Sequence, residues 1–291
     1  LVKSTASQLD RAKKQYEVGL ASITDLQDAQ AEYDSVRVTQ LSARSSVSYA
    51  QKALFQRTGQ EIKTIPQLSK DYPIRLDPNM TVDSLITKAR RDNKELRILN
   101  FTVESAENNI NIQKANGRTP TVSITGSLSR VDNNYTTTSS SYSDGITNTS
   151  SIALGVSIPL YSGGAINASV RQATAEAGAA TEQRASSLQA IELNIRSLYL
   201  DLQTAVAQIE AQQQLIRSRT SALEATKAGY DVGTRNLVEL LDAQSNLYNA
   251  QNTYEQYRYN FVLKKLSLLE TTGDLTEDNI KELDKWLIAK N

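Results

Sequence analysis

Apolar residues recur at a spacing of seven through a long, proline-free stretch from about Ala165 to Gly229. This spacing keeps one apolar stripe facing a partner helix and is typical of a coiled coil. At a rise of about 1.5 Å per residue such a helix is about 100 Å long, so we expect antiparallel neighbours of similar length. The repeated positions are Leu188, Ile195, Leu202, Ile209, Ile216, Leu223 and Tyr230.

Further helices are indicated on both sides of this stretch, and no proline falls within them, because an interior proline would remove a hydrogen bond. The connection from Gln60 to Met80 contains three prolines and is expected to be irregular. The expected helices run from Leu1 to Val18, from Ile23 to Arg57, from the cap residue Thr81 to a break near Asp92-Asn93, from that break to about Ala115, and from Leu237 to Glu270. A last short helix is expected from the cap residue Thr276 through a tail with Ile280, Leu283, Trp286 and Leu287.

The segment from Tyr16 to Gly59 matches the segment from Tyr230 to Gly273 at a constant offset of 214 residues. Tyrosine, valine, glycine, leucine, aspartate, alanine and glutamine recur in register, which indicates an internal duplication. Each copy is predicted to be a helix, a turn and a second helix. Gly19 and Gly233 are the tip-turn glycines, because glycine tolerates the left-handed backbone that ends a helix.

Two segments change to a period of two. Val122–Leu128 and Ile152–Leu160 alternate apolar with small or polar residues, and Asn133–Ser150 between them is expected to be a long exposed hairpin loop. Each strand has about ten residues, the length that crosses a bilayer at a tilt. One apolar and one small polar face fit the wall of a membrane barrel. An ordinary half-buried sheet alternates in the same way, so the pattern alone leaves both open.

Composition narrows the chemistry. The 291 residues include 32 basic and 32 acidic side chains, and a net charge of zero argues against a nucleic-acid partner. Without cysteine or histidine the chain has no disulfide, thiol or histidine chemistry, and no zinc site built on these residues. We find no catalytic constellation, cofactor motif or metal site, so we do not expect an enzyme. No apolar run reaches the ~20 residues of a membrane helix. Leu1 already stands in a helical pattern, so we expect a fragment whose start is missing.

Long coiled helices, a strand hairpin between them and a duplicated tip turn together resemble the TolC family of outer-membrane channels. Ile158–Gly164 is similar to the family's strand-to-helix junction. The residues that carry the resemblance are Tyr16-Glu-Val-Gly-Leu, Ile23-Thr-Asp-Leu-Gln and Ala29-Gln-Ala-Glu-Tyr33 in the first copy, and Gly229-Tyr-Asp-Val-Gly-Thr-Arg, Leu241-Asp-Ala and Leu247-Tyr-Asn-Ala250 in the second.

The resemblance implies a mainly α fold, with long antiparallel coiled-coil helices in an α-barrel and a transmembrane β-hairpin that contributes to a trimeric β-barrel. The family has a strand hairpin in each repeat, whereas the first repeat here lacks one, so three copies as given supply only six strands. The implied domains are a partial periplasmic helical hairpin of repeat 1 (1–59), an equatorial segment (60–92), a helix of repeat 2 (93–118), the transmembrane β-hairpin (119–162), the long helical hairpin with its periplasmic tip (163–273) and an equatorial C-terminal helix (274–291).

Glu239 and Asp242 lie three residues apart and therefore on one helix face. By resemblance they match two acidic rings at the periplasmic constriction, although the family has Asp at the first position. Such rings attract cations and repel anions. The alternative is that both acids are solvated and favour the helix macrodipole.

The resemblance also assigns six residues to a gate latch that ties the inner helix pair to the outer pair and to the next protomer. Asp25 and Arg235 could pair, since a guanidinium grips a carboxylate in two places, or they could form an exposed pair worth under about 1 kcal/mol. The family partner of Gln8 is acidic, but Lys227 stands there, and a hydrogen bond between them is still available. The latch positions are Gln8, Thr24, Asp25, Lys227, Tyr230 and Arg235.

The function implied is that of a passive exit duct in the outer membrane of a Gram-negative bacterium, with a large periplasmic part and a gate at the periplasmic tip. The expected partners are two further copies of the chain, outer-membrane lipid, a periplasmic adaptor and an inner-membrane transporter of the RND or ABC type, in tripartite efflux or type I secretion. The alternative is a structural coiled-coil or flagellin-like filament protein, which shares the low cysteine content and the long helices.

Overall fold

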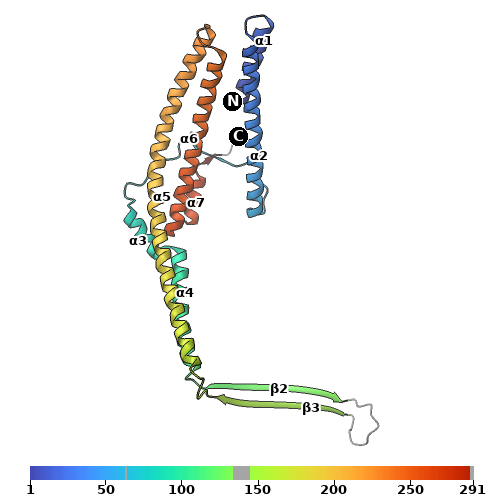
Figure 1. The fold of residues 1–291 in the computed structure, drawn as a ribbon, viewed down its shortest axis with the longest axis vertical. Coiled ribbons are helices and arrows are strands. Elements are labelled where there is room, and N and C mark those ends of the chain that lie inside the picture. The colour runs from blue at the N-terminus through green and yellow to red at the C-terminus, as the bar shows by residue number, and fades with distance from the viewer. Residues whose placement is uncertain (63, 134–144, 289–291) are drawn as a thin grey trace. The chain divides into compact units, whose positions relative to one another are not determined.

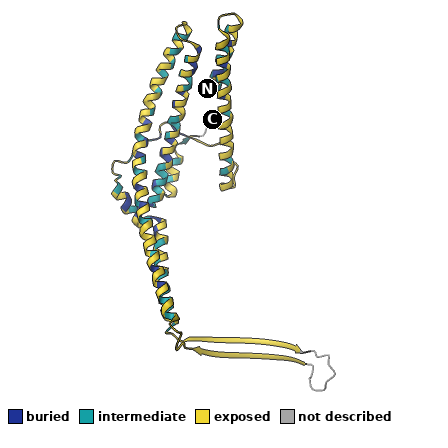
Figure 2. Ribbon diagram, in the orientation of Figure 1, coloured by how far each residue is buried: buried dark blue, intermediate teal, exposed yellow. Residues whose placement is uncertain are grey.

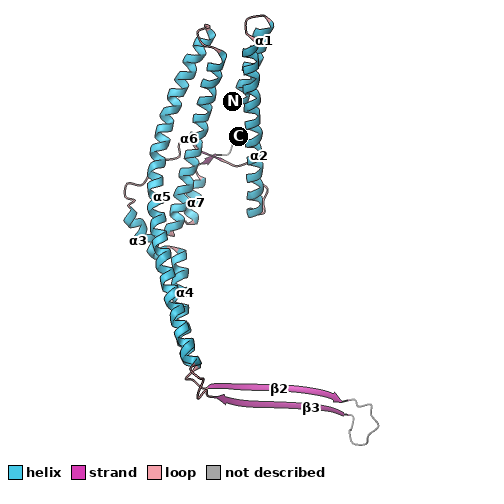
Figure 3. Ribbon diagram, viewed as in Figure 1, coloured by secondary structure: helices cyan, strands magenta, loops and turns pink. Residues whose placement is uncertain are grey.

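The computed structural model describes residues 1–62, 64–133 and 145–288. The chain is mainly helical and divides into two compact units, one combining Leu1–Asn93 with Ile191–Asn291 and the other formed by Lys94–Ala190 (Figures 1 and 3). One long helix, α5 (Ala165–Asp231), contributes residues to both units.

In the first unit, the helices confirm the predicted order, with bounds that differ by a few residues. The unit also contains the part of α5 from Ile191 onward, which runs antiparallel to α6 (Figure 1). The other helices are α1 (Val2–Glu17), α2 (Ile23–Thr58), α3 (Val82–Asp92), α6 (Leu237–Thr272) and α7 (Glu277–Asp284).

The internal duplication is visible in the two helices that follow the tip turns. Helices α2 and α6 both contain 36 residues, and their bounds keep the offset seen in the sequence. Each begins at a polar cap, Ser22 or Asn236, whose side chain accepts a hydrogen bond from the backbone N–H three residues on. Each ends at a glycine with left-handed backbone, Gly59 or Gly273. Local sequence therefore sets the length of both helices.

The residues spaced by seven lie along the buried seam of α5. Ile195 and Leu202 are fully buried and Ile209 is 4% exposed. The other four predicted seam positions are half-buried. Gln212 and Lys264 cross between the helices, the first donating to the Ala250 carbonyl at 2.9 Å and the second pairing with Asp201 at 3.1 Å. The predicted coiled-coil contact is thus formed with α6, its antiparallel neighbour.

The predicted C-terminal tail is wrong in one respect. Thr276 caps α7 as expected, but the helix ends at Asp284, so Trp286 and Leu287 lie beyond it. Instead, β4 (Leu287–Ile288) pairs antiparallel with β1 (Gln67–Leu68), inside the connection that was expected to be irregular. The backbone leaves the helix because this strand pairing satisfies hydrogen bonds that a further helical turn would otherwise supply.

A buried arginine of α6 also binds the connection between Gln60 and Met80. Arg258 is 1% exposed, and one of its Nη atoms donates to the carbonyl of Ser69. Its other Nη atom pairs with Glu255 at 2.8 Å, and its guanidinium carbon lies 5.6 Å from the ring centre of Tyr254. A buried cation is tolerated only with partners of this kind, so the segment around Ser69 is held by charge as well as by strand pairing.

Helix α3 meets the C-terminal end of α6 at a close junction. Gly273 has a φ of 80°, and a Cβ atom there would collide with the backbone carbonyl of Asp92. Glycine is therefore required at position 273 for two reasons: the left-handed backbone and the close approach of α3.

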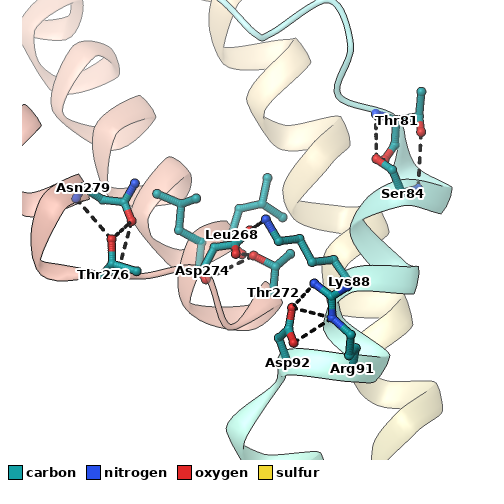
Figure 4. Close-up of polar contacts among 11 residues, drawn as sticks. Thr81, Ser84, Lys88, Arg91, Asp92, Leu268, Thr272, Asp274, Thr276 and Asn279 are labelled. Carbon is teal, nitrogen blue, oxygen red and sulfur yellow. Dashed lines mark hydrogen bonds and ion pairs between the residues drawn. The ribbon is translucent and has the colours of Figure 1, made fainter.

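Polar contacts surround this junction (Figure 4). Lys88 pairs with Asp274. The amide of Asn93 donates to the carbonyl of Thr271 at 2.7 Å. Thr272 is fully buried and donates to the Leu268 carbonyl at 3.0 Å. The contacts of Lys88 and Asn93 fix α3 on α6, whereas the Thr272 hydrogen bond lies within α6.

The second unit contains α4 (Lys94–Asn116), the hairpin of β2 (Thr121–Asn133) and β3 (Gly145–Ser157), and the first part of α5. Both strands extend into the predicted hairpin loop, since Asn133 belongs to β2 and Gly145–Ser150 belong to β3. The prediction is wrong at the other end of β3, which ends at Ser157, so Ile158–Leu160 lie beyond the strand. The rest of the predicted loop, 134–144, lies outside the described residues. Among the residues that are described, no helix has the length and apolarity that crossing a membrane requires.

The hairpin register places the apolar residues of both strands on one face. Val122 lies opposite Val156, and Ile124 lies opposite Leu154. The opposite face carries small residues, with Ser127 hydrogen-bonded to Ser151 across the strands at 2.7 Å. Both faces are exposed in the single chain (Figure 2).

Candidate functional site

The ends of four helices meet in a small apolar cluster, which we call the tip cluster. Its buried members are Ala12 of α1, Ala29 of α2, and Leu237 and Leu241 of α6. Tyr230, near the end of α5, packs against it with Leu9. The cluster positions the two tip turns, because each turn joins a pair of these helices.

Both tip-turn glycines adopt the left-handed backbone predicted for them, with φ values of 74° at Gly19 and 79° at Gly233. The second turn is the tighter in side-chain packing. A Cβ at Gly229 would lie 2.7 Å from Cγ of Arg235, so the arginine stem lies directly on that glycine.

The two acids proposed for the constriction have different surroundings. Glu239 is half-buried; its backbone N–H donates to Oδ1 of Asn236 at 2.8 Å, and its carboxylate accepts from Arg235 at 3.1 Å. Asp242 is exposed one turn further along α6. Both lie at the start of the helix, so the macrodipole favours their ionised forms.

The residues proposed for the latch are not all brought together in the single chain. Asp25 forms a capping box with Ser22, whose hydroxyl lies 2.7 Å from its carboxylate and 2.6 Å from Oγ1 of Thr24. Arg235 is bonded to Glu239 instead. The Asp25–Arg235 pair therefore stays a prediction. To form it, Asp25 would have to leave Ser22 and Arg235 would have to leave Glu239.

Gln8 is half-buried on α1 and Lys227 is exposed on α5. Their hydrogen bond also stays a prediction.

Three contacts that sequence reasoning missed tie α1 to the second helix pair. The Tyr230 hydroxyl donates to Gln15 at 3.1 Å, and Arg11 pairs with Asp231 at 3.5 Å. Nearby, Gln244 donates to the hydroxyl of Ser4. Opposite charges at positions 11 and 231 were the only sequence signal, and they carry no information about which helix faces which.

A second carboxylate pair spans α2 and α6. Partial burial, and then the charge of Asp242, raise the pKa of Glu32 above its ordinary value of 4.5. A raised pKa means that the fold favours the protonated acid. The protonated Glu32 carboxyl therefore contributes its full stabilisation at a pH below its ordinary pKa. This stabilisation is lost as the pH rises through the raised pKa of the folded protein.

We therefore expect Glu32→Gln to stabilise the protein near neutral pH by about 0.5 kcal/mol and to have no effect below the ordinary pKa of Glu32. The measurement is the thermal unfolding midpoint as a function of pH. Glu61→Gln, at an exposed position after α2, is the control and should leave the profile unchanged. Equal gains at acidic and neutral pH would contradict the argument.

The fold is shared with solved membrane proteins. A membrane protein from Pseudomonas aeruginosa superposes with a TM-score of 0.74, at 17% identity, over 95% of this chain and 62% of that one. The Campylobacter jejuni CmeC outer membrane channel gives a TM-score of 0.70 at 17% identity, over 98% of this chain and 61% of that one. The chain thus shares its fold with these proteins.

Sequence comparison gives the family. The chain belongs to the outer membrane efflux protein family, whose model matches residues 85–274. It is 31% identical over 286 residues to the outer membrane protein TolC of Escherichia coli strain K12. The match covers 96% of this chain and 58% of that relative, so the chain spans less than two thirds of the relative's length.

Proposed function

We propose that the chain forms part of a passive exit duct of the outer membrane, gated at the tip where α1, α2, α5 and α6 meet. The observation that carries this proposal is family membership together with the long α5–α6 hairpin that ends at the tip cluster. The acids of α6 would line the opening, and the tip turns would move when it widens. In this proposal the chain acts as a channel rather than as an enzyme or a filament subunit.

We further propose that β2 and β3 cross the outer membrane. Val122 and Ile124 lie opposite apolar partners on one face of the hairpin. The same face carries Leu128, which is 90% exposed, and Ile152, which is 86% exposed. An exposed apolar face of this size suits contact with lipid, and the small polar face suits a water-filled lumen. Since an open sheet edge is unfavourable in lipid, the hairpin would pair with strands of other copies in a trimer.

The remaining proposals follow from the same architecture. The domain ranges predicted from the sequence are kept as proposals, with residues 60–92 and 274–291 as the equatorial segment of a mostly periplasmic protein. A periplasmic adaptor and an inner-membrane transporter of the RND or ABC type would dock at the tip and open it, in efflux or type I secretion.

Reconstitution tests this function. Membranes from cells expressing the full-length protein should release it only with detergent, and the purified protein should give discrete, cation-selective currents in a planar bilayer. A filament protein would sediment without detergent and give no currents. Either of these two results would exclude the proposed function.

A separate prediction concerns the role of the Tyr230 hydroxyl in keeping the tip closed. Tyr230→Phe removes the hydroxyl that donates to Gln15 but keeps the ring in the tip cluster, so the closed tip should be weakened by about 1 kcal/mol. We expect the mean conductance in a planar bilayer to rise several-fold with unchanged thermal stability of the trimer. Tyr16→Phe, at the equivalent position of the first repeat and 42% exposed, is the matched control and should behave as wild type.

A further inference from the structure

The backbone of the second tip turn places the side chain of Arg235 beside the carboxylate of Glu239. The backbone N–H groups of Thr234 and Arg235 both donate to the Gly229 carbonyl, at 2.8 and 3.2 Å. This folds the chain back on the end of α5, with the stem of Arg235 against Gly229. The guanidinium therefore extends along the first turn of α6.

Both carboxylate oxygens of Glu239 have a donor there. Oε2 accepts from Nη1 of Arg235 at 3.1 Å, and Oε1 accepts from the Asn236 amide at 3.3 Å. Arg235 precedes the cap residue Asn236 and lies outside α6, so the turn rather than helical spacing brings its guanidinium to Glu239. The two side chains remain 59% and 40% exposed, so their combined charge acts on the surrounding solvent.

Asp242 stands in the opposite environment. It is exposed, and its charge raises the pKa of the Glu32 carboxyl on α2. One acid of the proposed constriction thus lies beside a cation and the other beside a second acid.

The first tip turn lacks this arrangement. The positions equivalent to Gly229 and Arg235 are occupied by Gln15 and Ala21. Asp25, the counterpart of Glu239, is held by the Ser22 cap. The cation–acid pair therefore belongs to the second repeat alone.

We propose that Arg235 determines ion selectivity by neutralising Glu239, which leaves Asp242 as the acid that sets the charge of the opening. The inference rests on the proposed channel function. Ions within a Debye length, about 8 Å at physiological ionic strength, respond to the sum of nearby charges, and the pair lies well inside that distance. Of the two acids Glu239 and Asp242, each protomer thereby contributes one effective negative charge rather than two.

The test is a charge cycle in the full-length protein in planar bilayers, with the cation-to-anion permeability ratio as the readout. Arg235→Gln releases the charge of Glu239 and should raise the ratio about twofold, whereas Glu239→Gln leaves Arg235 unpaired and should lower it about twofold. The double variant restores the original net charge and should return to the wild-type ratio. Arg219→Gln, which removes an exposed cation of α5 outside the proposed latch, is the control and should not rescue Glu239→Gln.

The double variant decides between two positions of Arg235. If Arg235 lies away from the opening, Arg235→Gln leaves the ratio unchanged and the double variant matches Glu239→Gln; that result overturns the inference. Gly229→Ala gives a second approach, since its Cβ displaces the arginine stem and should shift the ratio in the same direction as Arg235→Gln. A wild-type protein without cation-selective currents would reject the proposed function itself, which is a distinct outcome.

Discussion

Gly273→Ala is expected to lower the free energy of unfolding by about 3 kcal/mol. Alanine is strained at a φ of 80°, and its Cβ would collide with the backbone carbonyl of Asp92, which has no flexible side chain to move aside. Relief requires α3 to shift from α6, which breaks the contacts of Lys88 and Asn93. Chemical denaturation monitored by circular dichroism measures the loss.

Gly59→Ala is the matched control. Gly59 is the repeat counterpart of Gly273, has a φ of 68° and has no atom within 4 Å of the position that a Cβ would take. Only the backbone strain remains there, so the expected loss is about 1 kcal/mol. Equal losses at the two positions would show that the approach of α3 adds nothing.

Removal of both tip acids should have the largest effect on ion conduction. In Glu239→Ala/Asp242→Ala the carboxylates proposed for the constriction disappear while Arg235 stays, so the cation-to-anion permeability ratio should fall to about one or below. Block by a trivalent cation should be relieved as well, because such ions bridge neighbouring carboxylates. The reversal potential across a salt gradient measures the first effect.

Asp28→Asn is the control for this prediction, since Asp28 is the repeat counterpart of Asp242 and is exposed on α2. If only the second repeat lines the opening, its replacement should change the ratio much less. Full cation selectivity in the double alanine variant would mean that Glu239 and Asp242 are ordinary solvated residues at a helix start.

Several features of this protein follow from the sequence by itself. The twin helices α2 and α6, the cap residues Thr81 and Thr276, the buried stripe of α5 and the existence of the β2–β3 hairpin were all predicted. These features depend on short-range physics: side-chain caps, left-handed glycines, and periods of seven and two along the chain. The candidate constriction and latch residues were located by family resemblance, and their roles stay predictions.

Other features were decided by tertiary structure alone. Arg44 and Arg258 occupy equivalent positions in the repeats, yet Arg44 is exposed and Arg258 is 1% exposed. Val47 is 55% exposed, whereas its counterpart Phe261 is fully buried. Residues that are remote in the sequence make the difference, because the connection that carries β1 packs on the second copy, with Ser69 bonded to Arg258.

The partner chosen by each tip side chain was equally undetermined by sequence. The sequence suggested Asp25 as the partner of Arg235 and did not identify Gln15 as the acceptor of the Tyr230 hydroxyl. The turn at Gly229 directs Arg235 to Glu239, and the packing of α1 brings Gln15 to Tyr230. Local pattern thus determines the helices and their caps, whereas the choice among competing polar partners depends on where the backbone of other elements places each donor and acceptor.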